Sequence, residues 1–246
     1  MELHKIHLLD KRAENATTHT FMFDVPTDLA WPEGASIHLG SPKFDLKKGK
    51  DNKDSVRHLS IMSLAEEGVI AVTTRIPPSC SQYKKTLKNS SFGDTFVAFK
   101  LTNHMELRRQ DKPIILLSSG VAIATMRPLI RAYSNSNKGI ESMTHINVDS
   151  SQEFIFEEEL TWSAQTTNGL QNFYASTRDK FDELLNSKFN SNALYYVVGS
   201  DSFVIDISKR LLSKGIVVDS LVLDKPESFY QRLEADSLLN GVKESA

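Results

Sequence analysis

Three groups of polar residues have the types and spacing needed to bind a phosphorylated ligand. The first is Arg57-His58-Leu59-Ser60. Its guanidinium can pair with a phosphate through two hydrogen bonds, and the hydroxyl three positions later can hydrogen-bond a ring nitrogen. An ordinary strand end has the same composition, so this group by itself leaves both interpretations open.

The second group is Thr73-Thr74-Arg75, followed by Ser79-Cys80-Ser81 and a segment at 82–87 that we expect to be helical. Hydroxyls directly before a helix can cap its free backbone N–H groups. They can also hold a pyrophosphate at the same place. The sequence does not choose between a cap and a phosphate site.

The third group consists of two small-residue loops, Ser118–Thr125 and Gly199–Ser202, each between an expected strand and an expected helix. Small residues there allow a phosphate to approach the free N–H groups of the helix. Tight turns use the same residues for ordinary packing. The ligand-binding interpretation of these loops requires that their strands lie in one parallel sheet. The carboxyl edge of such a sheet is where these folds bind ligands.

The elements before about residue 110 read as β-structure. Short β-branched and aromatic runs are separated by turn residues, which indicates an antiparallel barrel or sandwich. We expect these strands at 20–25, 35–39, 69–76 and 95–99, with a charged surface loop at Lys43–Asp54.

The pattern changes after Pro113. Ile114–Leu117 is a continuous apolar run, as expected for a parallel strand covered on both faces. Strands and helices then alternate, which predicts a doubly wound α/β domain. We expect further strands at 143–148, 194–198 and 217–223, and helices at 124–133, 154–160, 178–185 and 202–214, with a short helix after Tyr230. The domains are therefore expected at residues 1–110 and 111–246.

Composition restricts the classes of function. The 246 residues carry a formal net charge of −2 and 40% apolar residues, which argues against a basic nucleic-acid binder. Cys80 is the only cysteine, so the chain cannot form an internal disulfide or a cysteine-ligated iron–sulfur or zinc site. The start lacks the apolar region of a signal peptide, and no run is long enough for a membrane span. A cytoplasmic location is the expectation.

The order of the motifs resembles the ferredoxin–NADP(H) reductase superfamily from about Lys5 to Tyr230. A turn and strand at Trp31–Ile37 precede the flavin motif Arg-x-Tyr/Phe-Ser-x-x-Ser, matched by Arg57, Ser60 and Ser63. The segment Thr74-Arg75…Ser81-Gln82-Tyr83-Lys84 follows, and then Gly93-Asp94. The loop Ser119–Thr125 and the segment Tyr196–Ser200 correspond to the two nucleotide motifs. The resemblance implies a two-domain protein, with an antiparallel Greek-key β-barrel followed by a doubly wound α/β parallel-sheet domain.

The resemblance also implies roles for individual residues on the flavin side. Arg57 would hold the flavin pyrophosphate, Leu59 would face the isoalloxazine, and Ser60 would be the catalytic residue near the ring N5 atom. Thr74, Arg75 and Ser81 would contact the ribityl chain or the phosphates.

On the nucleotide side, Gly120 and Thr125 would line the dinucleotide path, with Gly199 and Phe203 opposite. Phe229 or Tyr230 would cover the flavin face. The implied cofactor is FAD, with FMN as the alternative, and NAD(P)H is the implied co-substrate. The implied activity is a flavin-dependent NAD(P)H oxidoreductase that passes electrons to a protein or small-molecule acceptor.

The chain departs from the family pattern at several positions. The aromatic residue of the flavin motif is Leu59, the middle glycine and the proline of the dinucleotide loop are Ala122 and Thr125, and the cysteine before Gly199 is Val198. Asp149 stands where many members carry an arginine for a 2′-phosphate, and its charge would repel a phosphate. A module that keeps the fold without pyridine-nucleotide turnover, or one that takes electrons from a redox protein, therefore remains an alternative.

Other chemistry is not indicated by the sequence. The seven histidines lack the helical spacing and acidic third ligand of a zinc site, so no metal is expected. Trp31 and Trp162 are expected to be packing residues and not stacking platforms for nucleic acid. Neither the electron acceptor, nor the choice between NADH and NADPH, nor the oligomeric state follows from these residues.

Overall fold

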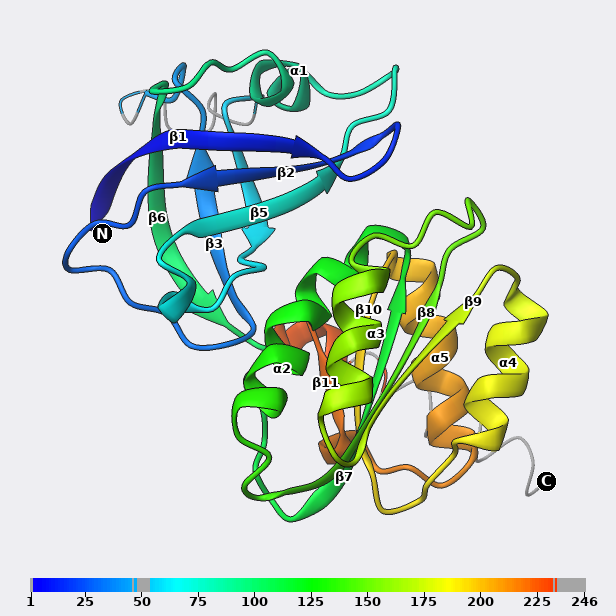
Figure 1. The fold of residues 1–246 in the computed structure, drawn as a ribbon. Coiled ribbons are helices and arrows are strands. Elements are labelled where there is room, and N and C mark those ends of the chain that lie inside the picture. Colours follow the sequence, from blue (N-terminus) through cyan, green and yellow to red (C-terminus); the bar gives the residue numbers. More distant parts are fainter. Residues whose placement is uncertain (1, 46, 48–53, 232, 234–246) are drawn as a thin grey trace. The chain divides into compact units, whose positions relative to one another are not determined.

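The protein was analysed as a computed structural model that describes residues 2–45, 47, 54–231 and 233. Its residues form two compact units (Figure 1). The first contains residues 1–107 together with 124–132, and the second contains residues 108–123 and 133–246. A stretch of helix α2 (Ile123–Asn135) therefore groups with the first unit although the ends of this helix belong to the second.

The first unit is built on a six-stranded antiparallel sheet. The strand order is β4-β3-β6-β1-β2-β5, so strands distant in the sequence are neighbours, as in a Greek key. Short helix α1 (Gln82–Lys88) lies between β5 and β6 in the chain. The strands are β1 (Leu3–Ala13), β2 (Thr18–Phe23), β3 (Ala35–Gly40), β4 (Val56–Ser60), β5 (Ile70–Arg75) and β6 (Thr95–Asn103).

The two edge strands of this sheet meet and close it into a barrel. Directly after β4, the Met62 N–H donates to the Ala71 carbonyl oxygen of β5 at 2.8 Å, and the Ala71 N–H donates to Ser63 Oγ at 3.0 Å. Closure removes unpaired backbone groups at the edges. The interior is filled by alternate residues of the strands, including Ile6, Phe21, Ile37, Leu39, Val72 and Phe96.

The second unit is built on a five-stranded parallel sheet in the order β11-β10-β7-β8-β9. Counted from β7, this is the order 3-2-1-4-5, which reverses direction between β7 and β10. Such a switch point leaves a crevice at the carboxyl ends of the two central strands. The strands are β7 (Lys112–Ser119), β8 (Ile140–Val148), β9 (Leu170–Ala175), β10 (Leu194–Val198) and β11 (Leu221–Leu223).

Helices cover both faces of the parallel sheet. Ile115, Leu117 and Ile146 pack with residues of α4 (Arg178–Ser187) and α5 (Asp201–Ser213) on one face. On the other face, the Asn172 side chain of β9 donates to the Leu160 carbonyl oxygen of α3 (Glu157–Thr166). The two-sided cover explains why β7 and β10 are continuous apolar runs. The predicted barrel and doubly wound sheet are both confirmed.

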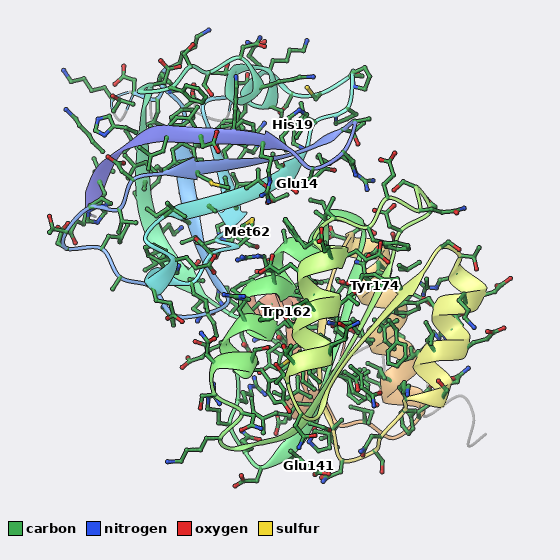
Figure 2. All side chains as sticks on the ribbon, viewed as in Figure 1. Glu14, His19, Met62, Glu141, Trp162 and Tyr174 are labelled. Atoms are coloured by element: carbon green, nitrogen blue, oxygen red, sulfur yellow. The ribbon has the colours of Figure 1, made fainter. Side chains whose placement is uncertain are left out.

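Several local predictions were wrong. Strands β1 and β9 were not predicted, and α3 begins at Glu157 and extends to Thr166 instead of spanning 154–160. The strand predicted at 217–223 contains a 3-10 turn at Val218–Ser220, and only Leu221–Leu223 pairs with β10. Trp31 is buried, but Trp162, on α3 in Figure 2, is 60% exposed. Most of the tail after Tyr230 and much of the loop predicted at 43–54 lie outside the described residues.

Candidate functional site

A cation and a buried hydroxyl lie together in the first unit, where β4 approaches α1. The Arg57 guanidinium lies over the Tyr83 ring, with its Cζ atom 5.3 Å from the ring centroid. Tyr83 is only 1% exposed, and its hydroxyl has no hydrogen-bond partner among the described residues. Burial raises the pKa of Tyr83, so this hydroxyl carries its proton and can donate it to a ligand.

Two further cations join Arg57 at this place. The Lys84 ammonium donates to the Arg75 carbonyl oxygen at 2.6 Å. Burial lowers the pKa of Lys84, the charge of Cys80 acts to raise it, and the positive charges of Arg57 and Arg75 lower it further. We call Arg57, Arg75, Lys84 and Tyr83 the cationic cluster. A bound anion would interact favourably with all three positive charges.

The donor set of the cationic cluster fits a diphosphate. Two guanidinium groups and one ammonium offer only donors, and the protonated phenol can donate as well, which matches an anion that offers only acceptor oxygens. Sequence reasoning gave Arg57 and Arg75 binding roles. It included Tyr83 and Lys84 in the same polar segment but gave them no role, because the sequence does not show which side of this short helix faces Arg57.

The remaining flavin-side residues are only partly brought together. Ser81 Oγ accepts from the Lys84 N–H at 3.4 Å as the N-cap of α1, so the capping interpretation holds for this hydroxyl. Thr74 is buried on the core-facing side of β5 that Ile70 and Val72 also use, whereas Arg75 lies on the other face.

Leu59 and Ser60 likewise lie on alternate faces of β4. Leu59 packs against the barrel interior. Within the first unit, Ser60 Oγ accepts a 3.0 Å hydrogen bond from Thr125 Oγ1 of α2. Thr125 was predicted to line the dinucleotide path, and the structure places its hydroxyl on the serine that was predicted to be catalytic.

In the second unit, the two small-residue loops meet at the carboxyl edge of the parallel sheet. Ser118 of β7 is paired in register with Val198 of β10, so Gly120 and Gly199 leave adjacent strands at the switch point. A Cβ atom on Gly199 would lie 2.7 Å from Phe203 Cδ1 and 3.2 Å from Ser119 Cβ. A side chain at position 199 would clash with these neighbours, so the close approach requires glycine. The two loops lie next to each other at the carboxyl edge of the sheet.

The aromatic residues predicted for the nucleotide side are engaged in packing. Phe203 is 6% exposed and packs edge-on against Phe181, with ring centroids 5.6 Å apart. Phe229 is buried in the same apolar core. The Tyr230 hydroxyl accepts from the Leu223 N–H at 2.7 Å and donates to the Leu223 carbonyl oxygen. These contacts account for the three aromatic side chains without a ligand, and a role in covering a flavin stays a prediction.

Asp149 lies just beyond the end of β8, near the same edge. Its Oδ1 atom accepts from the Ser151 backbone N–H at 2.9 Å and from Ser151 Oγ at 2.8 Å. The carboxylate thus closes a local turn and keeps a negative charge there. The expectation that this segment does not favour a 2′-phosphate stays a prediction.

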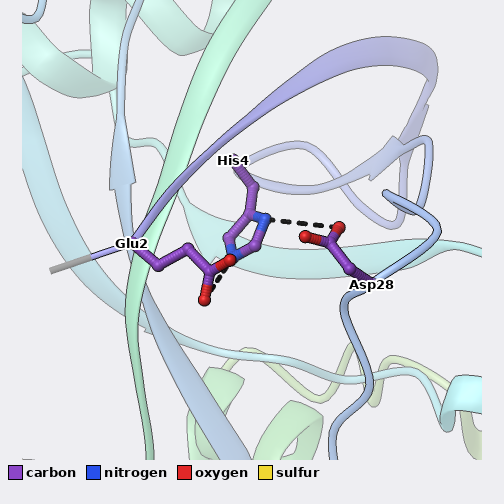
Figure 3. Close-up of side chains that lie close together, drawn as sticks. All are labelled: Glu2, His4 and Asp28. Carbon is purple, nitrogen blue, oxygen red and sulfur yellow. Dashed lines mark ion pairs between the residues drawn. The ribbon is translucent and has the colours of Figure 1, made fainter.

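Near the start of β1, an imidazole lies between two carboxylates. His4 Nδ1 lies 3.7 Å from Asp28 Oδ1, and His4 Nε2 lies 4.0 Å from Glu2 Oε2 (Figure 3). The two carboxylates thus approach opposite nitrogens of one ring, as ion pairs to a protonated histidine would. One ligand atom from each residue lies within 4.8 Å of the others, so the cluster also has the residue types of a cation site. The predicted absence of metal stays a prediction.

Comparison of the sequence with models of known protein families finds no match, and comparison with curated proteins finds none either. Solved structures do match. A ferredoxin NADP+ reductase from Neisseria gonorrhoeae with bound FAD and NADP has a TM-score of 0.76 and 14% identity, over 91% of this chain and 98% of that one. Ferredoxin-NADP+ reductase from Plasmodium falciparum gives 0.75 and 13%, over 90% and 95%.

A flavohemoglobin from Malassezia yamatoensis with bound FAD and heme also matches, with a TM-score of 0.73 and 14% identity. The match covers 91% of this chain but only 60% of the flavohemoglobin. At these identities the likeness concerns the fold. The chain has the ferredoxin reductase-like fold that the order of its motifs predicts.

Proposed function

We propose that this protein is a flavin-dependent oxidoreductase that passes electrons between NAD(P)H and a protein or small-molecule acceptor. The barrel would hold FAD, with FMN as the alternative, and the parallel sheet would hold the pyridine nucleotide. The observation that carries the proposal is the cationic cluster, because three partly buried cations and a buried phenol occur in the unit where this fold is expected to bind a flavin.

Each residue of the cluster has a task in this proposal. The Arg57 and Arg75 guanidinium groups would pair with the diphosphate, and Lys84 would add a third positive charge. The buried Tyr83 hydroxyl would donate the hydrogen bond that it does not make within the described part of the chain. Ser60 would hold its hydroxyl toward the redox-active ring.

The nucleotide half of the proposal depends on the carboxyl edge of the parallel sheet. Gly120 and Gly199 follow adjacent strands at this edge, and Ser200 caps α5 by accepting from the Phe203 N–H at 3.3 Å. When bound, a flavin would accept hydride from the nicotinamide and supply electrons to the acceptor. Support for the pair of ligands comes from the Neisseria reductase, which was solved with FAD and NADP.

The first test is an absorption spectrum of the purified full-length chain, before and after incubation with FAD and FMN. We expect the bands of an oxidised flavin, and bleaching on anaerobic addition of NADH or NADPH. A protein that stays colourless with both flavins would rule out the proposal. No helix among the described residues is long and apolar enough to cross a membrane. The cytoplasmic location and the electron acceptor stay predictions.

The second candidate is a flavin- or nucleotide-binding module of the same fold without turnover. It is favoured by one observation, the hydrogen bond from Thr125 to Ser60, because this bond uses the hydroxyl proton of Thr125, which the first candidate assigns to the dinucleotide path. This candidate predicts flavin binding without reduction by either nucleotide. Rapid reduction in a stopped-flow experiment would eliminate it.

A further inference from the structure

A polar chain crosses one face of the parallel sheet in the second unit. Its members are Ser118 of β7, His145 and Asn147 of β8, and Asn172 of β9. Ser118 pairs in register with Asn147, and His145 with Asn172, so their side chains follow one another across three strands. Ser118 and His145 are fully buried and Asn147 is 1% exposed. Polar groups at such depth are costly unless every one is hydrogen-bonded.

The donors and acceptors constrain this chain. Asn147 Nδ2 can only donate, and it donates to Ser118 Oγ at 2.8 Å and to the Gly120 carbonyl oxygen at 3.3 Å. The Ser118 hydroxyl keeps its own proton, which it can donate to His145 Nε2, 3.0 Å away. In that arrangement the ring is neutral, with its proton on Nδ1.

The other end of the chain is anchored on α3. His145 Nδ1 and Asn172 Oδ1 are both buried and make no hydrogen bond of ordinary geometry among the described residues. Asn172 nevertheless interacts with the ring and acts to raise the pKa of His145. Asn172 Nδ2 donates to the Leu160 carbonyl oxygen. Burial lowers the pKa of His145 to about 4, so the neutral ring that this pattern requires is the form present near neutral pH.

The loop end of the chain is where it meets the proposed ligand site. Gly120 is the first residue after β7 and has a φ of 60°, a left-handed conformation that glycine adopts readily. Its carbonyl oxygen is held by Asn147, so the backbone that enters the crevice is tied to β8. An apolar face would have stabilised the sheet equally well, and a buried polar chain that ends on a loop carbonyl indicates a positioning role.

We propose that Ser118, His145, Asn147 and Asn172 are positioning residues that hold the 119–122 loop in the conformation that binds the pyridine nucleotide. This inference rests on the proposed function. None of the four residues needs to contact the ligand. They act through Gly120, and their loss is expected to weaken nucleotide binding while flavin binding in the other unit is unchanged.

The test compares two network variants with a matched control. Ser118→Ala and Asn147→Ala break the chain at its loop end. Ser163→Ala removes a hydroxyl that is equally buried in the same unit but bonds Glu159 within α3. Each full-length, flavin-loaded variant is examined by hydrogen exchange of the 119–122 amides, by calorimetric titration with NAD+ and NADP+, and by flavin titration.

We expect the network variants to exchange the 119–122 amides several-fold faster and to bind the nucleotide about 5- to 20-fold more weakly, as expected for the loss of one buried hydrogen bond. Ser163→Ala should change neither quantity. Unchanged loop exchange with normal nucleotide affinity would overturn the inference and leave the proposed function standing, and so would equal effects in all three variants. A wild-type chain that binds neither nucleotide would overturn the nucleotide half of the proposed function, and this inference with it.

Discussion

At the scale of single residues, Arg57 has the clearest role that the proposed function assigns. Its guanidinium is half-buried, lies over the Tyr83 ring and also donates to the Val56 carbonyl oxygen at 2.7 Å. These contacts orient the side chain before a ligand arrives. A pre-oriented guanidinium loses little conformational entropy on binding a diphosphate, which is why we expect Arg57 to contribute strongly to flavin affinity.

Replacement of Arg57 by alanine should weaken flavin binding by about 1.5–3 kcal/mol, the range for a hydrogen bond to a charged group. Flavin affinity is measured by fluorescence titration of the apoprotein. Arg12→Ala provides the control, because Arg12 is an exposed cation of the same unit that pairs with Glu14 at 2.9 Å. Equal flavin affinity in Arg57→Ala and wild type would remove Arg57 from the site.

Tyr83→Phe tests the buried hydroxyl by itself. Since this hydroxyl has no partner among the described residues, its removal should leave the thermal stability of the flavin-free protein unchanged or slightly raised. The same variant should bind flavin more weakly, by about 1 kcal/mol, if the hydroxyl donates to a phosphate. Lower stability without flavin would show that Tyr83 has a partner within the chain and no need of a ligand.

At the scale of elements, the turn from β10 to α5 depends on one glycine. Gly199→Ala would place a Cβ atom 2.7 Å from the Phe203 ring, closer than non-bonded carbon atoms allow. We expect a loss of about 1–3 kcal/mol of stability, as for other overpacked sites. Urea unfolding of the variant measures this loss.

The double variant Gly199→Ala with Phe203→Leu distinguishes crowding from other causes. A leucine lacks the ring edge that the new methyl group would meet, so the two substitutions should together cost less than the sum of their separate effects. Additive losses would show that the glycine is needed for backbone conformation instead of for space.

At the scale of the whole molecule, the free energy of unfolding should fall in mild acid because the parallel sheet buries a neutral histidine ring. The buried ring of His145 has its pKa lowered to about 4, below the value near 6.5 of an unfolded histidine. Between these values the unfolded chain binds the proton and the folded chain does not. Stability is therefore complete above pH 6.5 and falls as the pH drops toward 4, by an amount on the order of 3 kcal/mol.

This prediction is checked by urea unfolding at several pH values between 4 and 7.5. His145→Gln keeps a hydrogen-bonding side chain but does not titrate, so its stability should depend less on pH across the same range. A wild-type curve that is flat between pH 4 and 6.5 would contradict a buried neutral ring.

A second titration contributes at lower pH. Burial would raise the pKa of Glu67, but hydrogen bonds and the charge of Arg127 outweigh burial and lower it. Both Glu67 oxygens accept from Arg127 at 3.0 Å within the first unit. The stability from this pair is present above the unfolded pKa of glutamate and is lost as the pH falls through the lower folded value. It therefore overlaps the His145 window only at the acid end, near the unfolded glutamate pKa of 4.5.

The sequence by itself determined the two architectures and the places where ligands could bind. Alternating strands before residue 110, the continuous apolar run at Ile114–Leu117 and the small residues after it are local patterns, and local patterns report which faces of an element must be buried. The sequence did not reveal β9, because its alternation is weak in Leu170–Ala175 and only pairing with β8 defines it as a strand.

The tertiary structure alone decided which side chains meet. Arg57 and Tyr83 are 26 positions apart in the sequence, and the packing of α1 against β4 places one over the other. The polar side chains that lead from Asn172 to Gly120 likewise meet only because β7, β8 and β9 pair in one register. A shift of one strand by one residue would turn its polar side chains to the other face of the sheet. Residue type and order are encoded locally, but contact depends on register and packing, which the whole chain fixes together.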